Sequence, residues 1–226
     1  MNDICKDCLM ATLGVGANCP TPNPIYTGCA FCITEADIKA ITWGRMGSLD
    51  KRKFKLGFKL LEVDPNGKLH PLFINKDATI RMDTEWKAGA YPTKGFANRP
   101  GIHLGKIPSA PWLMNQNGEY ASRRGKGWRR RWFIVAYNAT VDYTEEALKQ
   151  PEKCFREVPK NGFYTFFEKG RCHWYICSEA IIIAKLEEPE RQEILKGMEF
   201  DEKKEFLPYK EAFEKRAATL AKKKNK

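Results

Sequence analysis

The amino-terminal part of the chain carries cysteines whose spacing is typical of a metal site. The pairs Cys5/Cys8 and Cys29/Cys32 read C-x2-C-x20-C-x2-C. Each pair can turn two thiolates toward one centre, and two pairs supply the four soft ligands that tetrahedral zinc prefers. The sequence therefore predicts a zinc site, with Cys19, which lies between the pairs, as a further candidate ligand or a bystander.

The alternative interpretation of these cysteines is disulfide bonds or free thiols. Disulfides persist in oxidising compartments. The first seven residues, MNDICKD, lack the basic and apolar segments of a secretory signal. We therefore expect a cytoplasmic protein (the host cytoplasm if the chain is encoded by a phage), and this setting favours zinc over disulfides.

The hydropathy pattern predicts an α+β fold in three parts. A zinc-binding module covers residues 1–44, a β-rich central domain covers 54–186, and a helical basic tail covers 187–226, with a basic linker over 45–57. Alternating apolar residues around the turn Asp64-Pro65-Asn66-Gly67 predict a β-hairpin over 54–74. Further strands are expected at 132–137, 163–167, 172–177 and 179–186, with a short helix at 142–149.

The charge balance favours an acidic partner. Lysine and arginine total 39 against 28 aspartates and glutamates, which gives a net charge of +11. Such a surplus is typical of proteins that bind nucleic acid, although a generally basic surface gives the same count. No apolar run approaches the length of a membrane span, so no membrane partner is expected.

A Gly-rich stretch over residues 118–132 combines six cations with two tryptophans. Arginine can bind phosphate through paired hydrogen bonds, and tryptophan can stack on bases. The alternative is an ordinary hairpin tip whose tryptophans anchor the loop to the core. The candidate nucleic-acid-binding residues are Arg99, Lys106, Arg123, Arg124, Lys126, Trp128, Arg129, Arg130 and Arg131.

Residues 86–113 form a proline- and glycine-rich segment, and long structured loops of this kind are often functional. Residues 92–103 read PTKGFANRPGIH, and Pro108, Ala110 and Pro111 follow. Over residues 54–186 the chain resembles an uncharacterised domain family of bacteriophages and mobile elements. The resemblance implies a phage or prophage context and no specific activity. The chain has Ile102 where that family usually has an aromatic residue, and apolar residues at 134–136 where it often has acidic ones.

His103 is the residue of this loop whose side chain is best suited to catalysis or ligand binding. The run from Ile102 to Gly105 resembles the strand on which mono-ADP-ribosyltransferase-like enzymes place a histidine that holds the nicotinamide ribose. That resemblance implies an NAD-using transferase with Tyr164 or Tyr175 and Glu179 as its other site residues. The alternative role for His103 is a hydrogen bond to loop backbone that holds the loop in shape.

Together these features predict a binding protein rather than an enzyme. We expect a zinc-containing, phage-type accessory protein that binds nucleic acid or a nucleic-acid-bound complex through residues 92–106 and 123–131. One alternative is the ADP-ribosyltransferase-like enzyme centred on His103. The other is a protein-binding inhibitor of a host system, in which exposed tryptophans and arginines form the hot spot. DNA, RNA and protein partners stay open at this point.

Overall fold

The structure is a computed structural model that describes residues 53–91, 98–167 and 174–224. The predicted zinc ligands Cys5, Cys8, Cys19, Cys29 and Cys32 lie outside the described residues, and so does the rest of the predicted zinc module.

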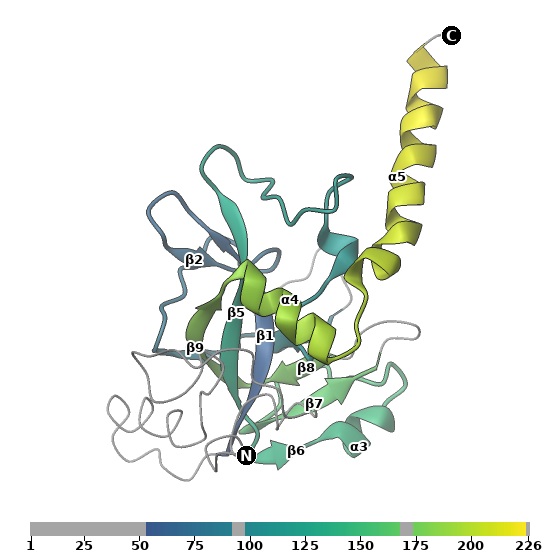
Figure 1. Ribbon diagram of the computed structural model, residues 1–226. Helices are drawn as coiled ribbons and strands as arrows, with labels where there is room; N and C mark the ends of the chain where they lie inside the picture. The colour runs from purple at the N-terminus through teal and green to yellow at the C-terminus, as the bar shows by residue number, and fades with distance from the viewer. Residues whose placement is uncertain (1–52, 92–97, 168–173, 225–226) are drawn as a thin grey trace.

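One curved β-sheet forms the body of the protein (Figure 1). Its strand order is β3-β9-β5-β1-β4-β8-β7-β6, with β2 paired to β1 beside this path. Neighbouring strands are antiparallel except β6 and β7, which are parallel. The strands are β1 Phe54–Val63, β2 Leu69–His70, β3 Glu85–Lys87, β4 Ile102–Gly105, β5 Arg129–Asn138, β6 Val141–Asp142, β7 Gly162–Phe166, β8 Trp174–Cys177 and β9 Glu179–Leu186. A sheet with a few helices confirms the predicted α+β class.

The predicted hairpin is present as β1 and β2, but its second arm is short. The Asp64 carboxylate accepts hydrogen bonds from the backbone N–H groups of Asn66 and Lys68, and Gly67 takes a positive φ of 81°. These contacts fix the turn, as the local sequence predicts. The arm ends at His70 because Pro71 has no N–H with which to continue the ladder.

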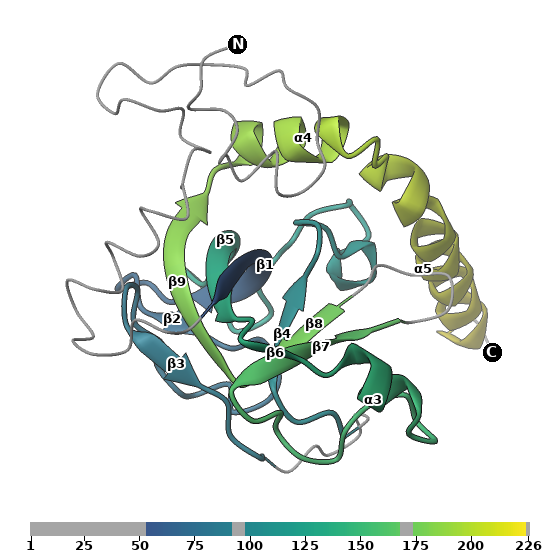
Figure 2. The same cartoon turned by 90° about the horizontal axis from the view of Figure 1, so that it is seen from below.

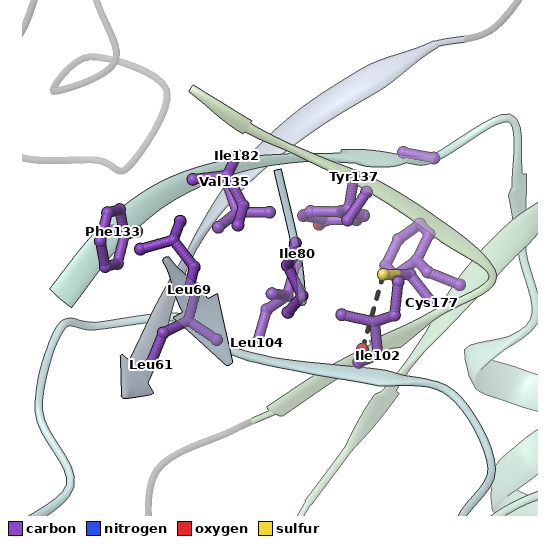
Figure 3. Close-up of a cluster of buried hydrophobic side chains, with 13 residues drawn as sticks. Leu61, Leu69, Ile80, Ile102, Leu104, Phe133, Val135, Tyr137, Cys177 and Ile182 are labelled. Carbon is purple, nitrogen blue, oxygen red and sulfur yellow. Dashed lines mark hydrogen bonds between the residues drawn. The ribbon is translucent and has the colours of Figure 1, made fainter. Parts of the chain in front are cut away.

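The sheet curves so far that strands from its two halves pack on each other. Alternate residues of β5 point to opposite faces, and Phe133, Val135 and Tyr137 point to the inner one. The Tyr137 ring stacks on Tyr175 of β8 with ring centroids 5.1 Å apart, although β1 and β4 lie between these strands in the sheet. Figure 3 shows this inner core, to which β4 contributes Ile102 and β9 contributes Ile182. A strand buried on both faces explains the unbroken apolar run at 132–137.

The helices cover the outer face and edges of the sheet. They are α3 Thr144–Leu148, α4 Glu188–Gly197 and α5 Glu202–Lys224, together with a 3-10 helix at Pro111–Leu113. Helix α4 packs Ile194 into the outer core beside β1 and β5 (Figure 1). Helix α5 runs away from the body, and Phe206 is its only buried side chain among those described. None of the helices in the described part of the chain has both the length and the apolar character required to cross a membrane.

Helices α3 and α4 begin in different ways. Helix α4 begins with Pro189 in its first turn, and the Glu187 and Glu190 side chains form a reciprocal capping box. Helix α3 has Tyr143 as its N-cap, which makes no side-chain capping bond. The carboxylate of Asp142, in β6, accepts the N–H of Thr144.

Candidate binding cleft

The sheet opens between β1 and β4. Strand β1 pairs with β5 along its whole length, whereas β1 and β4 are joined by one residue pair, Phe58 with Gly105. Beside that pair the Lys59 Nζ donates a hydrogen bond to the His103 carbonyl oxygen at 2.7 Å. A side chain therefore takes the place of a ladder hydrogen bond beside this single residue pair. Figure 2 shows the curve of the sheet from below, with β4 between β1 and β8.

A cleft of about 490 Å³ lies at this opening. That volume lies within the range typical of small-molecule sites. Its aromatic lining residues are Phe58, Phe73, Trp86, Tyr91, Trp112, Trp132, Phe166 and Trp174. Lys59, Asn75, Arg99, His103 and Ser109 supply the polar side chains, and none of the described lining residues is acidic. The cleft thus combines aromatic surfaces with positive charge.

His103 is held as a neutral imidazole at the wall of this cleft. Its Nε2 lies 2.7 Å from the Arg99 carbonyl oxygen, and because a carbonyl can only accept, Nε2 carries the proton and Nδ1 is left as an acceptor. Burial, with the nearby charges of Lys59 and Arg99, lowers the pKa of His103 from its usual 6.5 to about 4. The backbone contact predicted as the alternative role of His103 is therefore present.

The other residues of the predicted transferase site lie elsewhere. Tyr164 is fully buried beneath α3 against Phe155, and burial raises its pKa. Tyr175 lies on the inner face of the sheet. The Glu179 carboxylate accepts a hydrogen bond from the Asn138 amide at 3.1 Å. Of these candidates, His103 alone lines the cleft.

Arg124 and Trp128, predicted to bind nucleic acid, support one wall of the cleft. The Arg124 guanidinium donates to the backbone carbonyls of Pro71, at 3.1 Å, and of Lys76. It also lies over the Trp128 ring, which in turn packs against His70 with ring centroids 5.1 Å apart. These contacts hold the turn at 71–76, whose residues line the cleft.

Arg130 is buried, unlike its neighbours on β5. Its Nε lies 2.9 Å from the Glu62 carboxylate, and the two side chains are 6% and 2% exposed. It also donates to the backbone carbonyl of Leu113, a lining residue, at 3.1 Å. Arg130 shares a strand face with buried Trp132, so extending the alternation of β5 back to residue 129 would have identified it.

The remaining predicted cations are accessible to a ligand. Arg99 is half-buried, with its guanidinium 4.0 Å from the centre of the Phe166 ring at the edge of the cleft. The exposed members of the set are Lys106, Arg123, Lys126, Arg129 and Arg131. In contrast, none of the five described tryptophans is exposed, which leaves the hot spot of the predicted host-protein inhibitor without an exposed tryptophan in this part of the chain.

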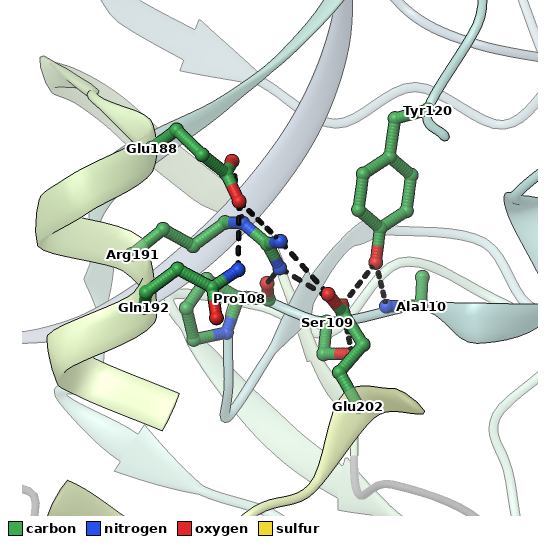
Figure 4. A network of polar contacts seen from close by, with 8 residues as sticks. All are labelled: Pro108, Ser109, Ala110, Tyr120, Glu188, Arg191, Gln192 and Glu202. Atoms are coloured by element: carbon green, nitrogen blue, oxygen red, sulfur yellow. Dashed lines mark hydrogen bonds and ion pairs between the residues drawn. The ribbon is translucent and has the colours of Figure 1, made fainter. Parts of the chain in front are cut away.

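A polar network that sequence reasoning missed supports the second wall (Figure 4). The hydroxyls of Ser109 and Tyr120 each donate to the Glu202 carboxylate at 2.6 Å. Arg191 of α4 donates to the same carboxylate at 2.8 Å and to the Pro108 carbonyl at 3.0 Å. Residues 108–113 are thereby fastened to α4 and to the start of α5.

The described residues of the cleft do not include a set of metal ligands. Within the described residues there is no group of three or more histidine, cysteine, aspartate or glutamate side chains that could hold a metal ion. Cys177 is a buried free thiol, with its Sγ 3.5 Å from the Ile102 carbonyl oxygen.

Comparisons with protein-family models, curated proteins and solved structures found no match to this chain.

Proposed function

We propose that this protein binds nucleotides, with the base in the aromatic cleft and the phosphates at the cations on its edge. The ligand is a free nucleotide or an unstacked nucleotide of a single-stranded nucleic acid, since both present a planar base beside a phosphate. The observation that carries the proposal is the composition of the cleft, in which indole walls stand beside Lys59 and Arg99 and no described lining residue is acidic.

The aromatic walls suit a nucleobase. Trp112 and Trp174 lie with ring centroids 5.4 Å apart, and Trp174 also meets His103 edge-on at 6.2 Å. Stacking of a base on an aromatic side chain contributes about 1–3 kcal/mol and tolerates different bases. The Nδ1 acceptor of neutral His103 can receive an N–H of the base or a hydroxyl of the sugar.

Arg99 is the residue best placed for the phosphate. Its guanidinium rests over Phe166 and has no carboxylate partner among the ion pairs of the described residues. A guanidinium binds phosphate oxygens through paired, charge-assisted hydrogen bonds. Lys59 adds a second positive group, held by its hydrogen bond to the His103 carbonyl.

The exposed cations extend this site toward a longer strand. Arg124 joins the loop at 122–128 to the cleft wall. Arg123 and Lys126 belong to the same loop, so they place two further positive charges next to that wall. Arg129 and Arg131 project from β5 on one face. A phage-type accessory protein, as the sequence resemblance implies, would use such a strip to hold the phosphates of single-stranded nucleic acid.

The test is a titration of the full chain with AMP, ATP, NAD and a short single-stranded oligonucleotide, monitored by tryptophan fluorescence and calorimetry. NAD is included because His103 lines the cleft. We expect Arg99→Gln to weaken mononucleotide binding roughly tenfold or more, as loss of a charge-assisted hydrogen bond is worth about 1.5–3 kcal/mol. The control is Arg156→Gln, an arginine that is 82% exposed and does not line the cleft, and it should leave the affinity unchanged.

Variants of the exposed cations distinguish binding of a free nucleotide from binding of a nucleotide within a strand. Changing Arg123 and Lys126 together to glutamine should weaken oligonucleotide binding, lower its salt dependence by about two units of slope, and leave AMP binding unchanged. Oligonucleotide binding without AMP binding would assign the cleft to strand ends or unstacked positions. If neither ligand responds to Arg99→Gln, the cleft is not the nucleotide site.

A further inference from the structure

The side chain of Lys59 is an amine held inside an aromatic cleft, with no acidic partner in the part of the chain that the structure describes. Its Nζ donates to the His103 carbonyl and lies 5.5 Å from the centre of the Trp86 ring. No ion pair of Lys59 is present among the described residues. The side chain is half-buried and lines the cleft, so the amine is reached from the cleft rather than from bulk water.

We propose that Lys59 is a nucleophilic amine that forms an imine with an aldehyde or ketone carried on an aromatic ligand in the cleft. This inference goes beyond nucleotide binding and does not depend on it, because the reaction needs the amine and the aromatic walls but no phosphate. Trp86 lies beside the amine and the lining of the cleft is rich in aromatic rings, which favours a carbonyl compound that carries a flat apolar ring.

The environment favours the neutral amine that this chemistry requires. Burial lowers the pKa of Lys59 to about 8, against a usual value near 10.5. A lysine desolvated in an apolar pocket is a recognised route to an activated nucleophile. The carbonyl of His103 can only accept, so it engages one N–H of the amine and leaves the nitrogen lone pair available to the cleft.

The reaction balances without an external oxidant or reductant. The Nζ lone pair attacks the carbonyl carbon, and the oxygen takes up one proton to give a carbinolamine. The nitrogen then forms a double bond to the same carbon as the hydroxyl leaves. The amine loses two protons in total, and the carbonyl oxygen departs as water.

The experiment uses pyridoxal, which joins an aldehyde to an aromatic ring and has no phosphate. The full chain is incubated with limiting pyridoxal near pH 7, imines are trapped by borohydride, and each lysine is quantified by peptide mass spectrometry. At pH 7 an amine with the pKa of Lys59 has about 300 times the neutral fraction of an ordinary lysine. Lower basicity also makes the nitrogen less nucleophilic, so we expect Lys59 to be labelled about tenfold faster than Lys55.

Lys55 is the matched comparison, because it lies on the same face of β1, is exposed, and packs over an aromatic ring, that of Phe163, at 5.3 Å. In urea the two lysines should be labelled at equal rates. Lys59→Arg keeps the positive charge and the hydrogen-bond donor but cannot form an imine, so it should fold and lose the preferred adduct. Equal labelling of Lys59 and Lys55 in the folded protein would overturn the proposal, whatever the result of the nucleotide titrations.

The Trp86 ring provides a second test of the environment. Trp86→Leu removes the indole beside the amine and admits water, so the pKa of Lys59 should rise toward its usual value, its neutral fraction at pH 7 should fall, and its labelling should slow toward that of Lys55. An unchanged rate in this variant would contradict the argument that burial in the aromatic cleft activates the amine.

Discussion

Arg130→Met tests whether Arg130 stabilises the fold or binds the ligand. Arg130 and its neighbours Arg129 and Arg131 form a run of like residues in the sequence, yet their surroundings alternate along β5. The Arg130 guanidinium is buried against Glu62, whose second carboxylate oxygen, Oε2, is buried without a hydrogen-bond partner in the described structure. Methionine fills much of the same space but leaves the Glu62 charge buried and unpaired.

The expected loss follows from that unpaired charge. Removing one partner of a buried ion pair typically lowers the free energy of unfolding by about 3–5 kcal/mol. Total stabilities are about 5–15 kcal/mol, so the variant should unfold at a much lower urea concentration. Replacing both partners with apolar residues, as in Glu62→Leu with Arg130→Met, should recover most of the loss because no charge is then left in the core.

The assay is urea denaturation followed by tryptophan fluorescence, paired with oligonucleotide titration. The control, Arg129→Met, changes the adjacent exposed arginine and should alter stability by less than about 0.5 kcal/mol while weakening oligonucleotide binding. The reasoning is refuted if Arg130→Met and Arg129→Met have equal stabilities, or if the double variant is no more stable than Arg130→Met alone.

Three further predictions concern the backbone, the second wall and pH. Gly101 has φ of 141°, and a Cβ there would lie 2.4 Å from Ile176 Cγ2, so Gly101→Ala should be less stable by at least about 1–3 kcal/mol in urea denaturation. Gly125 has a similar φ of 127° but open space around it, so the difference between Gly101→Ala and Gly125→Ala gives the contribution of the clash. Arg191→Met leaves Glu202 without its cationic partner and should speed limited proteolysis between α4 and α5, whereas Arg216→Met on the exposed part of α5 should not. The pKa of His103 is lowered to about 4 in the folded state, so the unfolded chain binds a proton first as pH falls. The free energy of unfolding should therefore be constant above about pH 6.5 and decline toward pH 4. His103→Gln should reduce this pH dependence, as measured by the urea midpoint across that range.

The parts of the fold that follow local rules could be predicted from the sequence. The first hairpin is encoded by period-two alternation and a turn held by Asp64, and the start of α4 is encoded by Pro189 and its capping glutamates. The predicted start of β5 at Trp132 was three residues late, since Arg129–Arg131 were assigned to the Gly-rich loop over residues 118–132. Burial of Arg130 depends on Glu62, which is 68 residues earlier, and no local pattern carries that pairing.

The cleft depends on a non-local feature of the sheet. Its opening arises because β1 and β4 pair only at Phe58 and Gly105, which is decided by tertiary packing rather than by the periodicity of either strand. The sequence did identify His103 and Arg99 as residues of interest, and both line the cleft. The aromatic character of the cleft was hidden, because its tryptophans come from segments spread between Trp86 and Trp174.

The arginines of this protein divide by whether a carboxylate accompanies them, and that division assigns their roles. Arg130 is paired with buried Glu62 and Arg191 with the partly buried Glu202, and each arginine also donates to a backbone carbonyl at a wall of the cleft, so their charges are neutralised in holding the walls. Arg99, at the edge of the cleft, rests on an aromatic ring instead. None of the described residues that line the cleft is acidic, so under the proposed function an anion with an aromatic ring would match both the charge and the aromatic lining of the site.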